Sequence, residues 1–232
     1  MICLVLPEPT IDGGRKRTRR LLDAMERAGV RPHIVTVDAR PDAAEALRAL
    51  GWRVDCIPDA APTLAARARQ FRARRPGLYN PALAEHLRSL AADPPAFVQV
   101  EHALAAGYPL PPTRPVALSM HNVDSEMMAT VAREQRTLTP GWARAWNRSL
   151  ATRSVERREV PRADVVLAVS DEDAAHFAAL GGRPLVVPNG VDDDLFAVRE
   201  APGADERVLF FGQLGYAPNT LGLLRFIREG WP

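Results

Sequence analysis

Short apolar runs alternate with longer amphipathic runs along most of this chain, and this alternation is the feature that most restricts its fold. Each short run is continuously apolar and bounded by Pro, Gly or Asp, as is typical of strands buried on both faces of a parallel sheet. Strands and helices in this rhythm predict an α/β fold with a doubly wound parallel sheet. The predicted strands are Ile2–Leu6, His33–Val37, Arg53–Ile57, Phe97–Val100, Val116–Ser119, Val165–Val169 and Leu185–Val187.

Recognisable helix ends separate the strands of this Rossmann-like pattern. Gly29 and Gly51 each follow an amphipathic run, as glycines in the left-handed conformation do after a helix. Ser170 begins a further helix with a capping-box sequence, and that helix is expected to end at Gly181-Gly182. Residues 123–161 contain no strand pattern, only two helical runs divided by Thr139-Pro140-Gly141. This helical insertion either covers a cleft or serves packing alone.

Composition excludes several classes of protein. With 47% hydrophobic and 25% charged residues the chain has the balance of an ordinary globular protein, and its formal net charge of +2 does not require a nucleic-acid partner. Cys3 and Cys56 lie in apolar runs, which indicates a reducing compartment rather than a disulfide framework. The apolar start is too short for a signal peptide or membrane span. We therefore expect a cytoplasmic protein.

Ligands of an open parallel sheet bind beyond the carboxyl ends of its strands, so the residues after each strand are candidate site residues. Asp12-Gly13-Gly14 follows the first strand and precedes a helix, with Arg15, Lys16 and Arg17 next in the chain. Two glycines at a helix N-terminus suit the close approach of an anion. A strand-to-helix turn that needs glycine for its own geometry is the alternative.

Polar residues also follow the fourth and fifth strands. Glu101-His102 comes after one and His121-Asn122 after the other, with Asp124 and Glu126 close behind. Such residues at neighbouring strand ends would hold a sugar by hydrogen bonds or supply a base. The alternative is that each histidine only caps a strand end. The sequence contains no H-E-x-x-H and no C-x-x-C pair, so no metal is expected.

An arginine-rich run after Pro62 is the candidate for contact with a membrane. As a helix it would lie on anionic lipid at the inner membrane surface and deliver a lipid-linked acceptor. A solvated helix face is the alternative, which the many arginines elsewhere in the chain favour. The arginines of this run are Arg67, Arg69, Arg72, Arg74 and Arg75.

The pattern changes near residue 197. Residues 1–196 form the predicted domain, and residues 197–206 lack periodicity and contain Pro202 and Gly203, as linkers do. Residues 207–232 then predict one strand, Arg207–Phe211, and one helix, Asn219–Arg228, which are too few to form a domain. We expect the strand to pair with the edge of the first domain or with a second copy, giving self-association through residues 207–232.

The segment Val187–Phe196 reads V-P-N-G-V-D-D-D-L-F and resembles the V-P-N-G-V-D-x-x-x-F signature of family 4 retaining glycosyltransferases, which have the two-domain GT-B fold. Four other segments are similar to motifs of that family and occur in the same order. The Y-x-P-N ending of the last is typical of a subgroup associated with exopolysaccharide assembly. These segments are D-G-G-R-K-R at 12–17, H-N-V-D-S-E at 121–126, V-S-D-E-D at 169–173 and L-F-F-G-Q-L-G-Y-A-P-N at 209–219.

The resemblance implies transfer of a sugar, with retention, from a nucleotide diphosphate sugar to a saccharide or lipid-linked acceptor. Catalysis in such a site is electrostatic and positional, without a metal or cofactor. The resemblance assigns the catalytic role to His121. It assigns donor binding to Gly13, Gly14, Arg15 and Gly212, and the acceptor side to Glu101, His102, Asn122 and Glu126.

The E-x7-E motif of the family, and the basic residues that hold the diphosphate, lie further along than Pro232. The chain is therefore expected to be the N-terminal half of a GT-B enzyme and inactive by itself. Two other functions stay open. A sugar-nucleotide epimerase of the same architecture would need clustered carboxylates, for which Asp124 and Glu126 are the candidates. A naturally shortened, non-catalytic copy would serve as a binding or interaction module.

Overall fold

The computed structural model describes residues 1–58, 80–134, 139–197, 208–215 and 217–231. At its centre is a seven-stranded sheet in the order β3-β2-β1-β4-β5-β6-β7, and all neighbouring strands are parallel. The predicted doubly wound, Rossmann-like α/β fold is confirmed. The strands are β1 (Ile2–Cys3), β2 (His33–Thr36), β3 (Arg53–Cys56), β4 (Val98–Glu101), β5 (Val116–Ser119), β6 (Val165–Ala168) and β7 (Pro184–Val186).

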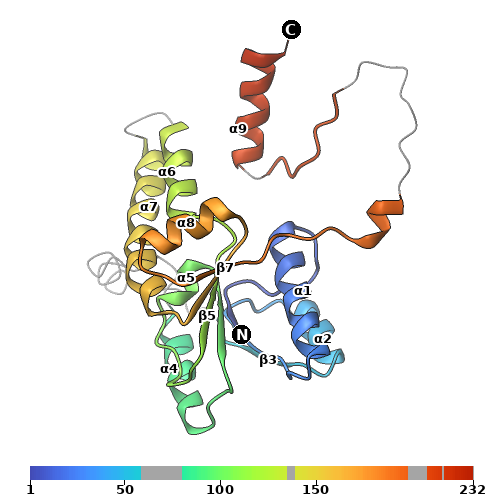
Figure 1. The fold of residues 1–232 in the computed structure, drawn as a ribbon, viewed down its shortest axis with the longest axis vertical. Helices are drawn as coiled ribbons and strands as arrows, with labels where there is room; N and C mark the ends of the chain where they lie inside the picture. Colours follow the sequence, from blue (N-terminus) through green and yellow to red (C-terminus); the bar gives the residue numbers. More distant parts are fainter. Residues whose placement is uncertain (59–79, 135–138, 198–207, 216, 232) are drawn as a thin grey trace.

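Helices cover both faces of the sheet (Figure 1). Because strand side chains alternate between faces, one sheet supports two apolar clusters. The cluster beside α1 and α2 contains Leu22, Ile34 and Leu47, whereas Leu87 and Phe177 belong to the cluster on the other face. The first face carries α1 (Gly13–Arg27) and α2 (Pro41–Ala49); the second carries α4 (Pro81–Ser89), α5 (Ala103–Ala106), α6 (Asp124–Glu134), α7 (Pro140–Glu159) and α8 (Asp171–Ala179).

The first strand is shorter than the sequence predicts. β1 ends at Cys3 instead of Leu6, whereas the six other strands lie within one or two residues of their predicted bounds. The backbone N–H of Leu6 donates to the Asp38 Oδ2 atom at 2.9 Å, a side-chain acceptor. An apolar run thus continues past the point where its backbone stops pairing with a neighbouring strand.

Helix ends lie where the sequence places them. The Ser170 hydroxyl accepts a hydrogen bond from the backbone N–H of Asp173 at 3.1 Å, which caps α8. Gly181, after the C-terminal residue of α8, has a φ of 87°, a left-handed conformation that costs glycine least. Thr139 caps α7 and Pro140 begins it, so this pair divides the helical insertion as predicted.

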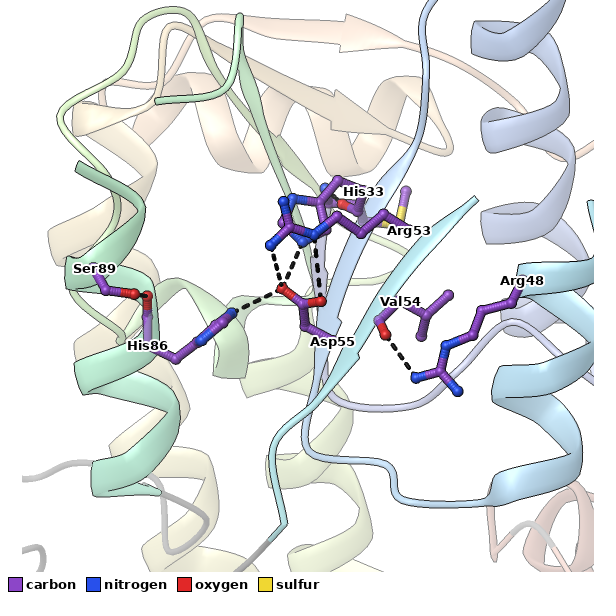
Figure 2. A network of polar contacts seen from close by, with 8 residues as sticks. His33, Arg48, Arg53, Val54, Asp55, His86 and Ser89 are labelled. Carbon is purple, nitrogen blue, oxygen red and sulfur yellow. Dashed lines mark hydrogen bonds and ion pairs between the residues drawn. The ribbon is translucent and has the colours of Figure 1, made fainter. Parts of the chain in front are cut away.

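A polar cluster on the α4 face of the sheet ties that helix to β2 and β3 (Figure 2). One carboxylate oxygen, Asp55 Oδ2, lies 2.8 Å from His33 Nε2 and 3.0 Å from His86 Nε2. The guanidinium of Arg53 lies 3.4 Å from the same oxygen. The pKa of Asp55 is below its usual range, because the hydrogen bonds and charge of these neighbours outweigh its partial burial. His33 and Arg53 are the first residues of β2 and β3, so the cluster lies toward the amino ends of these strands and not at the carboxyl ends where ligands bind.

The predicted strand at residues 207–211 is wrong for the part described, since residues 208–211 have no strand conformation. Leu209 and Phe211 are 88% and 97% exposed. A strand forms only where a neighbour satisfies its backbone, and no described strand of this chain pairs with the segment. The predicted helix is confirmed as α9 (Ala217–Arg225), extended by a π-helical turn at Phe226–Gly230 and lying apart from the sheet in Figure 1.

Several other expectations lie outside the described residues. The arginine-rich run at 67–75 falls there, and so does the linker apart from Ala197, which ends the short helical turn Asp193–Ala197. The division into domains at residues 196 and 207, and self-association through residues 207–232, stay predictions.

Replacing Gly182 by alanine should destabilise the protein by about 1–3 kcal/mol, because overpacking of a filled interior costs this much. A Cβ there would lie 2.6 Å from Val160 Cγ1 and 3.0 Å from the Phe177 carbonyl oxygen. Urea unfolding should show the loss. Gly190→Ala is the matched control, because nothing lies within 4 Å of its Cβ position. Equal stability of the two variants would contradict the packing described for Gly182.

Candidate functional site

The strand order changes direction between β1 and β4, and this is where a crevice forms in an open parallel sheet. From β1 the chain builds outward through β2 and β3, then returns to the other side and builds outward from β4 to β7. The loops that follow β1 and β4 therefore diverge from each other at the carboxyl ends of these two strands. The loop after β1 leads into α1, whose N-terminus lies at this switch point of the sheet.

The start of α1 is organised by Asp12, which sequence reasoning did not identify as a cap. Its Oδ1 atom accepts a hydrogen bond from the backbone N–H of Arg15 at 2.9 Å. The Arg15 side chain returns to the same carboxylate, with Nε 3.2 Å from Asp12 Oδ2, and so partly neutralises it. Gly13 and Gly14 are the first two helical residues, whose N–H groups have no partner within a helix.

Gly14 lies against His121, which follows β5. A Cβ added to Gly14 would be 3.4 Å from His121 Nδ1 and 3.4 Å from Asp12 Oδ1. At Gly13 the same construction meets nothing within 4 Å. The structure thus brings together the two segments singled out from the sequence, with the imidazole beside a helix N-terminus that attracts anions.

Glu101, the last residue of β4, is buried beneath this histidine with 1% exposure. Its Oε2 atom lies 2.9 Å from His121 Nε2 and 3.4 Å from the Thr18 hydroxyl of α1. The amide of Gln99 donates to the other carboxylate oxygen. Burial alone would raise the pKa of Glu101, but the hydrogen bond and charge of His121, with the Gln99 hydrogen bond, hold it below its usual value. The carboxylate is therefore ionised and fully engaged by protein groups.

His102 lies beside this pair in a strained backbone conformation. Its φ is 68°, the only positive φ of a non-glycine residue in the described ranges, and such strain concentrates at functional sites. The ring centroids of His102 and His121 are 4.2 Å apart. Burial, with a smaller effect from the charge of His121, lowers the pKa of His102 to about 4. His102 is therefore neutral at physiological pH.

Three predicted site residues are exposed and not part of this buried cluster. Asn122 is exposed, and Glu126 is 69% exposed at its side chain and paired with His176 of α8 at 3.5 Å. The reason is helical geometry, since each residue of α6 is rotated about 100° from the last, so that Ser125 is buried and Glu126 points outward. Gly212 is also exposed, and the nearest atoms to its Cβ position belong to Phe210 and Asn219 of its own segment.

Sequence reasoning missed the polar residues beneath the crevice, Thr18 and Gln99. The signal for Gln99 was its place two residues before Glu101 in the strand V-Q-V-E, which puts both on one face. Val98 and Val100, on the other face, join the large apolar cluster. Nothing in the sequence distinguished Thr18 from other helical residues, because its partner is distant in the chain.

A second buried carboxyl group, that of Glu156, supports the segment that follows His121. Glu156 of α7 is 1% exposed and accepts a hydrogen bond from the backbone N–H of Ser125 at 3.0 Å. Burial raises its pKa, and burial together with the charge of Glu156 raises the pKa of Asp124 to about 6. α7 therefore holds the first turn of the helix that follows His121, and that the insertion covers a cleft stays a prediction.

With this geometry established, comparison with known families is informative. The model of Glycosyltransferase Family 4 matches residues 11–195, and the chain belongs to this family. A search of curated proteins gave no match. A solved structure described as sucrose-phosphate synthase from Thermosynechococcus elongatus is 14% identical, covers 84% of this chain and 92% of its own, and has a TM-score of 0.43. A likeness of this size adds nothing to what the sheet topology shows.

Two further observations concern the described residues alone. Among them no group of three His, Cys, Asp or Glu side chains is placed to hold a metal ion. No helix in the same residues is long and apolar enough to cross a membrane. The expectations that the reaction uses no metal and that the protein is cytoplasmic stay predictions.

Asp124→Asn should stabilise the protein at pH 7 by about 1–2 kcal/mol. In the folded protein the pKa of Asp124 is raised to about 6, against about 3.9 in an unfolded chain. The folded state thus holds this proton more tightly, and wild type loses stability as pH rises between these values. The variant has no such proton, so its free energy of unfolding should fall less over that range in urea titrations.

Glu126→Gln is the matched control for this measurement, because Glu126 is on the same helix but largely exposed. The free energy of unfolding of Glu126→Gln should change with pH as that of the wild type does. If that of Asp124→Asn does so too, Asp124 ionises freely in the folded protein and the raised pKa is wrong.

Proposed function

We propose that this chain acts in the transfer of a sugar, with retention, from a nucleotide diphosphate sugar to a saccharide or lipid-linked acceptor. The observation that supports the proposal most is the contact of Gly14 with His121 at the switch point of the sheet, in a chain of glycosyltransferase family 4. The N-terminus of α1 offers unpaired N–H groups and a positive dipole, which suit the donor diphosphate.

The contribution that we propose for Gly13, Gly14 and His121 to catalysis is mainly electrostatic. When the sugar leaves its donor, negative charge develops on the diphosphate, and the N–H groups of Gly13 and Gly14 would stabilise that charge. His121 lies 3.4 Å from the Gly14 Cβ position, as close as Asp12 does, and would contact the donor at its reacting end. Fixed donors need no reorganisation during reaction, which is the source of their catalytic value.

The four residues predicted for the acceptor side have different surroundings, so we assign them different roles. Asn122 is exposed at the end of β5 and can meet an acceptor directly. Glu101 and His102 lie beneath His121, so their part is to support it. Glu126 is bound to His176 and would reach an acceptor only by leaving that partner.

The remaining expectations are part of the proposal. Residues 1–196 would be the acceptor-side half of a GT-B enzyme, and Gly212 would belong to a second, nucleotide-sugar half. The reaction would use no metal, and the product would be an exopolysaccharide precursor made in the cytoplasm, at or near the inner membrane surface. The basis for these finer assignments is the motif order from Asp12 to Asn219.

The epimerase alternative needs two carboxylates together in the crevice. Its candidates are separated, because Asp124 is partly buried near Glu156 whereas Glu126 points outward to His176. No observation in the described residues favours this alternative. The other alternative, a non-catalytic interaction module, is distinguished from a transferase by assays with nucleotide sugars.

His121→Ala should lower the rate of transfer about 100-fold, the cost of losing one fixed transition-state donor. The measurement is release of nucleoside diphosphate from a panel of nucleotide sugars with saccharide and lipid-linked acceptors. It is made with the 232-residue chain and, if the gene reads on past Pro232, with its full product. His86→Ala is the matched control, since this partly exposed histidine lies on α4 and contacts Asp55, which has no part in the proposed site.

Undiminished turnover by His121→Ala would remove this residue from the site. If no product of the gene binds or turns over any nucleotide sugar, the chain is an interaction module and the transferase proposal fails.

A further inference from the structure

Glu101 is too deeply buried to contact a sugar, yet it binds the side chain that the proposed reaction needs. We propose that Glu101 is a positioning residue: it holds the Nε2–H of His121 and thereby turns Nδ1 toward Gly14, where the donor diphosphate would lie. The identity of that ligand rests on the proposed function. The orientation of the ring rests on geometry alone.

The two nitrogens of the His121 ring face different partners. Nε2 lies 2.9 Å from Glu101 Oε2, whereas Nδ1 lies 3.4 Å from the position of a Gly14 Cβ. An ionised carboxylate can only accept hydrogen bonds. Nε2 must therefore carry a proton, and Nδ1 is the atom presented to a ligand at the start of α1.

The carboxylate of Glu101 cannot readily turn to release the ring. Gln99 binds one of its oxygens, and Thr18 approaches the other, the oxygen that His121 shares. β4 and β5 are in register, with Glu101 opposite Ser119, and His121 follows Ser119 by two residues. Backbone pairing thus sets the distance that the hydrogen bond spans.

The charges around His121 explain why this arrangement suits an anion. The titratable groups facing it are Glu101 and His102 at the end of β4, Asp12 before α1 and Asp124 in α6. His102 is neutral, and Asp12 is paired with Arg15. A neutral ring protonated on Nε2 has a lone pair at Nδ1, so Nδ1 donates to a phosphate at Gly14 only when it carries a second proton. The carboxylate of Glu101 balances the positive charge of that ring, as in other carboxylate–histidine pairs.

Nitrogen-15 NMR of the imidazole rings tests the proposal without any need for catalysis. The spectrum of His121→Ala identifies the His121 signals among the five histidines of the chain. In the wild type, the neutral ring should carry its proton on Nε2. Glu101→Leu should lose this preference and give a mixture of the two tautomers.

Thr18→Val is the matched control, because it removes a neighbouring contact of the same carboxylate while leaving the charge and the His121 hydrogen bond. It should keep the wild-type tautomer. A wild-type ring protonated on Nδ1 with a bare Nε2 would overturn the proposal, and this measurement remains decisive if Glu101→Leu does not fold.

Titration with inorganic pyrophosphate tests the ligand-facing atom. The Nδ1 resonance of wild-type His121 should shift on addition of pyrophosphate, and the shift should be lost in Glu101→Leu. An Nδ1 resonance that does not respond in the wild type would overturn the assignment of this atom to the ligand. A protonated Nε2 together with absent sugar transfer would count against the proposed function alone, so the two failures are distinguishable.

Discussion

The buried carboxylate of Glu101 is the constraint on which the crevice depends. An ionised group with 1% exposure is costly unless its charge and hydrogen-bonding capacity are met. Here they are met by Gln99 of the same strand, Thr18 of α1 and His121 beyond β5. Three elements are thereby held at one point, and removing one partner would leave the buried charge with less compensation.

The helix α1 links this point to the segment that follows the last strand. The guanidinium of Arg17 donates to the carbonyl of Pro188 at 3.2 Å and to the Asn189 side chain at 3.1 Å. Lys16 and Arg20 both bind the Asp192 carboxylate, and these contacts hold its pKa below the usual range. The V-P-N-G-V-D sequence is therefore anchored on the helix whose first residues face the crevice, which gives the motif a structural role.

Much of the fold could be predicted because its signals are local. Apolar runs such as Val116–Ser119 mark strands, and Ser170 or Gly181 mark helix ends through contacts within a few residues. The same reasoning failed at residues 208–211, where an apolar run has no neighbouring strand to pair with. Sequence reasoning also could not place the Glu126 side chain, because motif membership does not state which way a helical side chain points.

The sequence by itself determined the layered α/β architecture, the family and the two segments, Gly13-Gly14 and His121, that the crevice brings together. Periodicity, caps and motif order carry that information, and each is encoded over short stretches of chain. Only the tertiary structure decided that Glu101 supports His121 from below and that Thr18 completes its surroundings. These contacts join residues 20 to 83 positions apart, and a buried charge acquires its partners only when the strands pair and α1 packs onto the sheet.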